Sequence, residues 1–181
     1  MGKPERAVYA EATVDAPLRD VWQAWTTEAG VRSFFAPACR VKLRLQGAYE
    51  MYFDPSAPEG RRGGEGMILL AIQEPTLLSF TWNAPPELPS VRPQQTHVTL
   101  RLLARTPRTT LVTLHHDGWG EGGEWEEAFR YFESAWREVI LPRLRYRFAV
   151  GPVDWANRPD LTPWRSASPF RSRGRTNRSG R

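Results

Sequence analysis

Cysteine, which forms disulfides, and histidine, which together with cysteine most often binds zinc, are scarce in this sequence. The 181 residues include one cysteine, Cys39, and three histidines. A single cysteine excludes an internal disulfide, and so few soft ligands argue against a structural zinc site. No apolar run approaches the roughly 20 residues of a membrane-spanning helix. Residues 1–13 are charged and lack an apolar core, so we expect no signal peptide and a cytoplasmic protein without metal or cofactor.

Lysine is also rare, and arginine supplies most of the positive charge. The chain has 25 Lys and Arg against 20 Asp and Glu, a net charge of +5. Residues 1–142 carry a net charge of −3, whereas residues 143–181 carry ten arginines, two aspartates and a net charge of +8. The net positive charge is the main reason to expect that the whole protein binds nucleic acid, and it does not belong to residues 1–142. The seven arginines of residues 158–181 either bind nucleic acid or anionic membrane nonspecifically or form a solvated extension.

Hydrophobic periodicity divides the rest of the chain into an ordered series of elements. It predicts a strand over residues 7–14, two short helices over 18–25 and 27–36, and six strands between 41 and 116. One of these strands is expected over residues 41–45, where Val41, Leu43 and Leu45 alternate with basic residues. A long amphipathic helix begins near Trp125, and Pro142 should end or kink it. We therefore expect one domain over residues 1–146 and an irregular to disordered Arg-rich tail over 147–181.

The hairpin of residues 96–116 allows a sharper prediction about its histidines. Residues that lie opposite each other in an antiparallel pair share one face of the sheet. The alternating apolar residues of both strands have even numbers, so they face inward together only if the numbers of two paired residues sum to an even value. A sum of 212 places Thr96 opposite His116 and His97 beside His115. His116 is then expected to point inward, while His97 and His115 point outward.

Six short motifs in order resemble one known family. They are Ala16-Pro17 with Val21-Trp22 and Ala24-Trp25-Thr26, Phe34-Phe35-Ala36-Pro37, Gly47-Ala48-Tyr49-Glu50, Glu74-Pro75 before Leu78-Ser79-Phe80-Thr81-Trp82, Leu114-His115-His116-Asp117-Gly118-Trp119, and Trp125-Glu126 through Phe132 and Trp136. The chain resembles the SRPBCC (START-like, helix-grip) superfamily, and within it the bacterial activator of heat-shock-protein-90 ATPase-like family. The resemblance implies an α+β helix-grip fold, with a curled antiparallel sheet of six to seven strands wrapped around a long C-terminal helix.

A cavity between that sheet and the final helix is the natural place for a ligand. The expected lining is mostly aromatic, with His116 as its best polar group: Phe35, Tyr49, Met51, Phe80, Trp82, Val98, Leu114, His116, Trp119, Trp125, Phe129, Phe132 and Trp136. The same side chains would equally suit a plain hydrophobic core. For His116 the alternatives are an acid–base role in the cavity or hydrogen bonds to Thr96 or a loop carbonyl.

Three functions remain open from the sequence, because relatives in the superfamily bind hydrophobic molecules, cyclise polyketides or contact a chaperone. Binding of a hydrophobic small molecule fits the aromatic lining best. A cyclase or hydrolase would use His116 or Tyr49, although no nucleophile–base–carboxylate set is recognised in the sequence. A chaperone-linked interaction module would present an exposed apolar patch on the outer face of the sheet.

Overall fold

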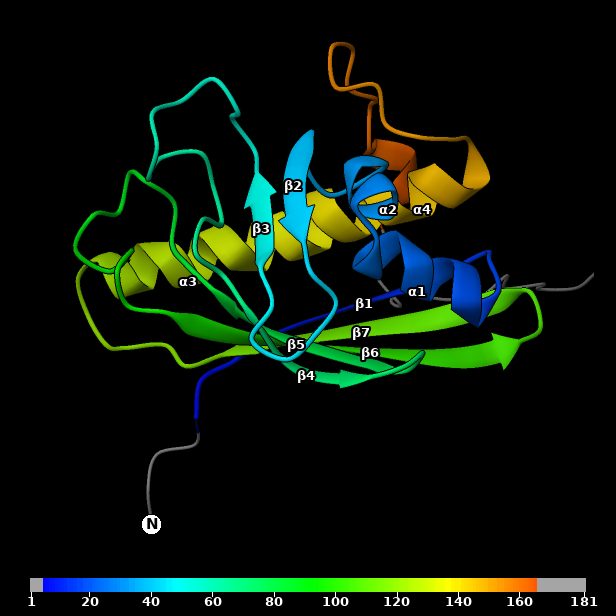
Figure 1. Cartoon of the computed structure of the whole chain (residues 1–181), viewed down its shortest axis with the longest axis horizontal. Coiled ribbons are helices and arrows are strands. Elements are labelled where there is room, and N and C mark those ends of the chain that lie inside the picture. Colours follow the sequence, from blue (N-terminus) through cyan, green and yellow to red (C-terminus); the bar gives the residue numbers. More distant parts are fainter. Residues whose placement is uncertain (1–4, 166–181) are drawn as a thin grey trace, which may run out of the picture.

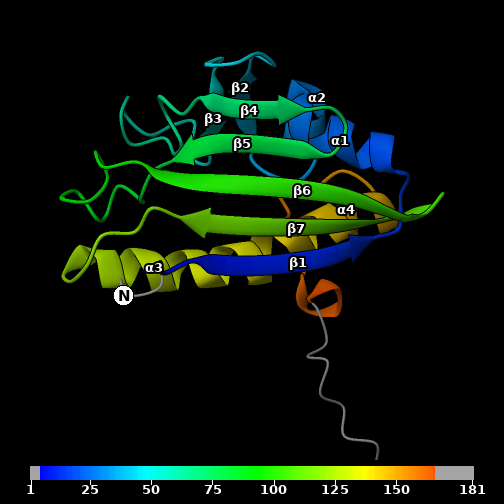
Figure 2. The same ribbon diagram turned by 90° about the horizontal axis from the view of Figure 1, so that it is seen from below.

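A five-stranded antiparallel sheet forms one layer of the computed structural model, which describes residues 5–165. The strands follow the order β1-β7-β6-β5-β4, which Figure 2 shows from the outer side of the sheet. Their bounds are β1 Val8–Val14, β4 Leu69–Gln73, β5 Leu77–Trp82, β6 Thr96–Thr106 and β7 Thr109–Asp117. Buried side chains alternate with more exposed ones along β1 and β7, so one face of the sheet supplies the core.

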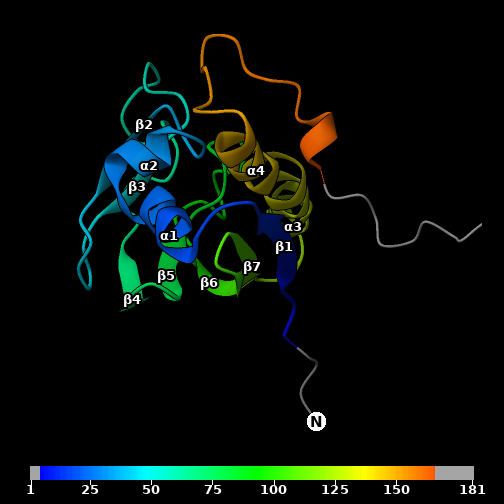
Figure 3. The same cartoon turned by 90° about the vertical axis from the view of Figure 1, so that its right-hand side faces the viewer.

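A second, smaller layer of helices and strands lies over the inner face. Helices α1 (Leu18–Thr26) and α2 (Glu28–Arg32) lead to a two-stranded sheet of β2 (Ala38–Val41) and β3 (Tyr49–Tyr52). A bridge between Ala48 and Ile68 connects this small sheet to the start of β4. Figure 3 shows the small sheet with α1 and α2 on one side of the inner face and the final helix on the other. The α+β helix-grip architecture is thus confirmed, and the seven strands found within residues 5–165 are divided into five and two.

The final helix crosses the whole inner face (Figure 1). α3 (Glu124–Ser134) passes into a π-helical segment, η1 (Ala135–Ile140), and then into α4 (Leu141–Ala149). Pro142 does not end the helix. It has no N–H for the Glu138 carbonyl, which instead accepts a hydrogen bond of 3.2 Å from Nε of Arg165, and the wider π turn accommodates the proline. Among the described residues 5–165, no helix is long and apolar enough to cross a membrane.

The prediction of a strand over residues 41–45 is wrong. β2 ends at Val41, and the side chains of Leu43 and Leu45 are 44% and 66% exposed. Alternating Leu and basic residues imitate a half-buried strand, but the N–H of Arg44 bonds to Lys42 O and the chain reverses. The backbone hydrogen bonds of a tight turn therefore replace those of a sheet over this segment.

The register of the β6–β7 hairpin also differs from the expected one, although its faces do not. Paired residue numbers sum to 214, so His116 lies opposite Val98 and His97 lies opposite Asp117. Because 214 is even, the prediction that His116 points inward and that His97 and His115 point outward is confirmed.

Residues 150–165, which we call the C-terminal strap, pack against the domain beyond the boundary expected at residue 146. The N–H of Val153 donates to the carbonyl of Ser33, and Nε1 of Trp155 donates to the carbonyl of Arg32 at 2.8 Å. Farther on, the ring of Trp164 lies 6.0 Å from that of Tyr146. The remaining Arg-rich tail, residues 166–181, lies outside the described residues.

Candidate functional site

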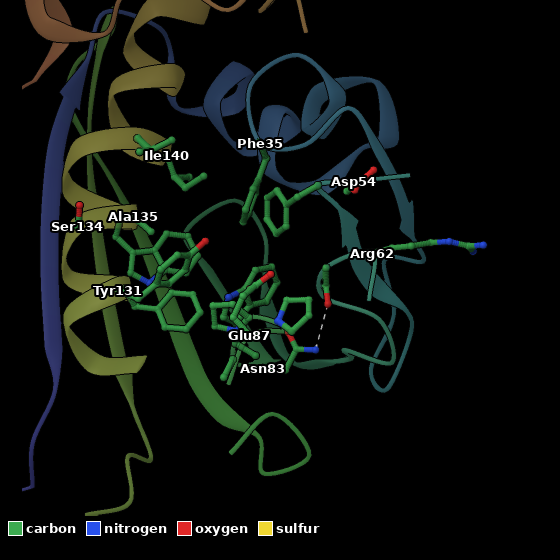
Figure 4. A pocket seen from close by; sticks show the side chains of 18 of the residues that line it. Phe35, Asp54, Arg62, Asn83, Glu87, Tyr131, Ser134, Ala135 and Ile140 are labelled. Carbon is green, nitrogen blue, oxygen red and sulfur yellow. Dashed lines mark hydrogen bonds between the residues drawn. The ribbon is translucent and has the colours of Figure 1, made fainter. Parts of the chain in front are cut away.

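A cleft of about 470 Å³ lies between the final helix and the loops that follow β3 and β5. Figure 4 shows Tyr131, Ala135 and Ile140 on the helix side, with Phe35 facing them from the chain after α2. The loop after β3 contributes residues 53, 54 and 61–63, the loop after β5 contributes residues 83–87, and the C-terminal strap contributes Trp155 and Arg158. The cleft thus has apolar walls of helix and sheet and a polar rim of loops.

Four of the thirteen residues predicted for the site line this cleft. They are Phe35, Trp82, Phe132 and Trp136. The ring centroids of Phe35, Trp82 and Trp136 lie 5.7–5.9 Å from one another, so each ring fixes the other two. These rings form a preorganised aromatic wall.

The other nine predicted residues are part of the surrounding core and do not line the cleft. Tyr49, Met51, Phe80, Val98, Leu114 and His116 are fully buried. Trp119, Trp125 and Phe129 pack at the start of the final helix, where Trp119 and Trp125 contact a small cluster that includes Leu88 and Val91. Strand and helix periodicity separates inward from outward side chains, but it does not separate a packed core from the wall of a cavity.

The residues that sequence reasoning missed are the charged ones at the rim. Five arginines and two acidic residues line the cleft: Arg61, Arg62, Arg92, Arg143, Arg158, Asp54 and Glu87. The concentration of arginine after residue 142 is a signal for Arg143 and Arg158 only, and it does not indicate that they lie beside the aromatic wall. The strap brings part of that charge back to the cleft.

His116 is held by a directed chain of hydrogen bonds. The indole N–H of Trp136 can only donate, and it lies 3.0 Å from Nδ1 of His116. Nε2 therefore carries the ring proton and donates to Oγ1 of Thr96 at 2.6 Å, which in turn donates to the carbonyl of Trp82. The alternative in which Thr96 satisfies His116 is the one observed, and neither ring nitrogen is free to exchange a proton with a ligand.

Acid should destabilise the protein through His116. Burial, helped by the charges of His97 and His115, lowers the pKa of His116 well below 6.5, so protons bind preferentially to the unfolded chain. The free energy of unfolding should fall by up to about 1.4 kcal/mol per pH unit as the pH drops below about 6.5, and this contribution should be constant above that pH. Urea unfolding between pH 5 and 8 measures the slope.

The control removes the imidazole that titrates. His116→Gln keeps a polar side chain on the inner face but binds no proton, so it should flatten the slope relative to the wild type. Equal slopes for the wild type and His116→Gln would contradict the assignment.

Two further groups, a hydroxyl and a thiol, are also unavailable for acid–base or nucleophilic chemistry. The hydroxyl of Tyr49 donates to the carbonyl of Trp25 at 2.8 Å, and burial raises the pKa of Tyr49 well above 10. Burial likewise raises the pKa of the Cys39 thiol to about 11, so it carries little thiolate at neutral pH. Among the described residues, no group of three or more His, Cys, Asp or Glu side chains is placed to hold a metal ion.

A serine–histidine–aspartate set that the sequence analysis did not recognise lies on the outer face of the sheet. Oγ of Ser79 is 2.6 Å from Nε2 of His97, and Nδ1 of His97 is 3.1 Å from Oδ1 of Asp117. The order of contacts is that of a hydrolytic triad. However, Ser79 is only 5% exposed and none of the three residues lines the cleft, so the set acts as a cross-strand hydrogen-bond network.

The two rim loops are joined by Arg92. Its guanidinium donates to the carbonyls of Gly60, Gly63 and Ala84, and it lies 3.7 Å from the carboxylate of Glu65. Gly63 has φ +148°, and a Cβ there would collide with the carbonyl of Met51. The rim is therefore a fixed part of the cleft.

Comparison with known proteins agrees with this fold. The family model described as "Activator of Hsp90 ATPase homolog 1-like protein" matches residues 15–148. A search of curated protein sequences found no match.

Among solved structures, a protein from Mesorhizobium loti is 19% identical, with 79% of this chain and 93% of that chain covered and a TM-score of 0.59. An Hsp90 activator from Plasmodium falciparum is 14% identical, with 81% and 96% covered and a TM-score of 0.59. CalU16 from Micromonospora echinospora is 21% identical, with 84% and 79% covered and a TM-score of 0.58. At such identities the likeness shows the fold alone. Because the family model spans most of the sequence, the chain belongs to the family of activator of Hsp90 ATPase homolog 1-like proteins, with the SRPBCC-type fold that its motifs indicated.

Proposed function

We propose that this protein binds an apolar small molecule in the cleft beside the final helix. The observation that carries the proposal is the aromatic wall of Phe35, Trp82 and Trp136 in a cleft of about 470 Å³. Preformed concave sites of roughly 300–1,000 Å³ with mostly apolar walls are the usual form of small-molecule sites. Removal of apolar ligand surface from water supplies the free energy of binding.

Fluorescence titration with N-phenyl-1-naphthylamine, a neutral apolar probe, tests this proposal. We expect saturable binding that Ala135→Phe weakens by about tenfold or more, because the added ring occupies the cleft (Figure 4). The matched control is Arg130→Phe on the same helix, where the side chain is exposed and does not line the cleft. Absence of probe binding, or equal affinities for the two variants, would refute the proposal.

The geometry supports catalysis by His116 or Tyr49 less well than it supports ligand binding. Both acid–base candidates, His116 and Tyr49, are fully buried, their polar atoms bond to other protein groups, and neither lines the cleft. A cyclase or hydrolase needs an acid–base group in reach of the bound substrate. We therefore propose binding without catalysis by these two residues.

A chaperone-linked role finds little support on the outer sheet face. Among the described residues, the large apolar side chains most exposed on the sheet strands are Tyr9, Leu70 and Leu103, which lie on three different strands. Scattered apolar residues are normal on a protein surface, whereas an interaction site usually presents a continuous patch. Nonspecific binding of nucleic acid by residues 158–181 stays a prediction, since most of these residues lie outside the described range.

A further inference from the structure

Arg143 is a buried cation without an anionic partner. It lines the cleft from α4 and is 9% exposed. Within residues 5–165, its guanidinium has neither an ion pair nor a hydrogen bond, and its observed contact is the face of the Trp155 ring, with Cζ 5.0 Å from the ring centroid. Burial of an unpaired charge is costly, and such charges in proteins normally meet a counter-ion.

Within residues 5–165, the group that raises the pKa of Arg143 is the phenol of Tyr131, and no carboxylate pairs with the guanidinium. Burial, together with the charge of Arg158, lowers the pKa of Arg143 to about 10, so the side chain is still cationic at neutral pH. The acidic residues of the cleft, Asp54 and Glu87, form no ion pair with Arg143, and the carboxylate of Asp54 instead accepts hydrogen bonds from Ser56. Residues 1–4 and 166–181 contain no Asp or Glu.

The geometry also fixes where the charge is presented. Trp155 is held by the hydrogen bond from its Nε1 to the carbonyl of Arg32, and its ring supports one side of the guanidinium. Arg143 and Arg158 thus line the same cleft as the aromatic wall of Phe35 and Trp136. A molecule with an apolar body and one acidic group would satisfy both parts of the cleft.

We propose that the cleft binds an amphipathic organic anion, whose apolar body lies against the aromatic wall and whose carboxylate or phosphate head group pairs with Arg143. This inference rests on the proposed function and adds the charge of the ligand to it. An arginine fork makes two parallel hydrogen bonds to a carboxylate or phosphate, and such bonds are stronger where water is excluded.

Two fluorescent probes with the same body and different charge test the inference. 8-Anilinonaphthalene-1-sulfonate carries one anionic group that N-phenyl-1-naphthylamine lacks. We expect the wild type to bind the anionic probe about tenfold or more tightly than the neutral one. Arg143→Met, which keeps an apolar stem, should abolish this preference and change the affinity for the neutral probe less than twofold.

Two further variants control for folding and for general electrostatics. Arg143→Lys keeps the charge but not the fork, so the preference should drop severalfold even if Arg143→Met did not fold. Arg130→Met removes an exposed arginine of the same helix that does not line the cleft, and it should leave the preference within about twofold.

Competition against the bound anionic probe then distinguishes the head groups. 2-Naphthoate, 2-naphthyl phosphate and 2-naphthamide share one apolar body, and we expect one or both anions to displace the probe at concentrations at least about tenfold lower than the amide. Whichever anion displaces better identifies the head group. Equal displacement by the amide, or an anionic preference that survives both Arg143 variants, would overturn the inference. Binding of the neutral probe without any anionic preference would overturn this inference alone, whereas no binding of either probe would also end the proposed function.

Discussion

Replacement of Trp136 by alanine should lower the free energy of unfolding by about 3–5 kcal/mol. The side chain is 1% exposed and packs between Phe35, Trp82 and Phe132. Its truncation would leave a cavity and would also remove the hydrogen bond to Nδ1 of His116. Urea unfolding followed by far-ultraviolet circular dichroism measures the loss.

Two variants separate the causes of this loss. Trp136→Phe keeps much of the packing but leaves Nδ1 of His116 unpaired, so it should cost about 1–3 kcal/mol. Tyr131→Ala, on the same helix but 52% exposed, should cost less than about 1 kcal/mol. If Trp136→Ala were no more destabilising than Tyr131→Ala, packing of Trp136 in the aromatic wall would not contribute to stability as expected.

Replacement of Arg92 by alanine should have the second largest effect, a loss of about 2–3 kcal/mol. Removal of the guanidinium leaves the carbonyls of Gly60, Gly63 and Ala84 without their partner and separates the two rim loops. Arg92→Lys retains the charge but not the planar fork, so it should restore less than half of the loss. Denaturant unfolding gives the free energy, and hydrogen exchange of residues 53–66 and 83–92 reports the release of the loops.

The control for Arg92 is Arg101→Ala on β6. Arg101 is exposed on the outer face of the sheet, so its loss should change the free energy of unfolding by less than about 0.5 kcal/mol. Faster exchange confined to the two loops in Arg92→Ala would support the assigned role. Unchanged exchange there would show that the loops hold their positions without Arg92.

The β6–β7 hairpin shows how far sequence reasoning reached. Burial of Val98, Leu100 and Leu114 requires an even sum of paired numbers, and this requirement predicted the inward face of His116. The value of the sum depends on the turn. Thr106 pairs with Thr109, and an irregularity between Ala104 and Thr106 shifts the register to the even sum of 214. Hydrophobic pattern thus decides the face, while turn geometry decides the partner.

The candidate site was less predictable for a related reason. Tyr49 and Phe35 are both fully buried aromatic residues, yet only Phe35 lines the cleft. The difference depends on whether other side chains fill the space in front of the ring, and that information is spread over distant segments. Arg143 shows the same limit. The cost of burying its charge and its proposed role in ligand binding depend on Trp155 and Arg158 of the strap, and no local pattern places these residues beside Arg143.

The sequence by itself determined the order of the elements, the inward faces of β6 and β7, the family, and the scarcity of groups that bind metal. These properties follow from local periodicity and from short motifs, which are encoded in neighbouring residues. Only the tertiary structure decided which aromatic rings form a wall, which loops close over it, and that part of the basic C-terminal segment returns to the cleft. Packing and electrostatics act between residues far apart in the chain, so their outcome requires the folded arrangement.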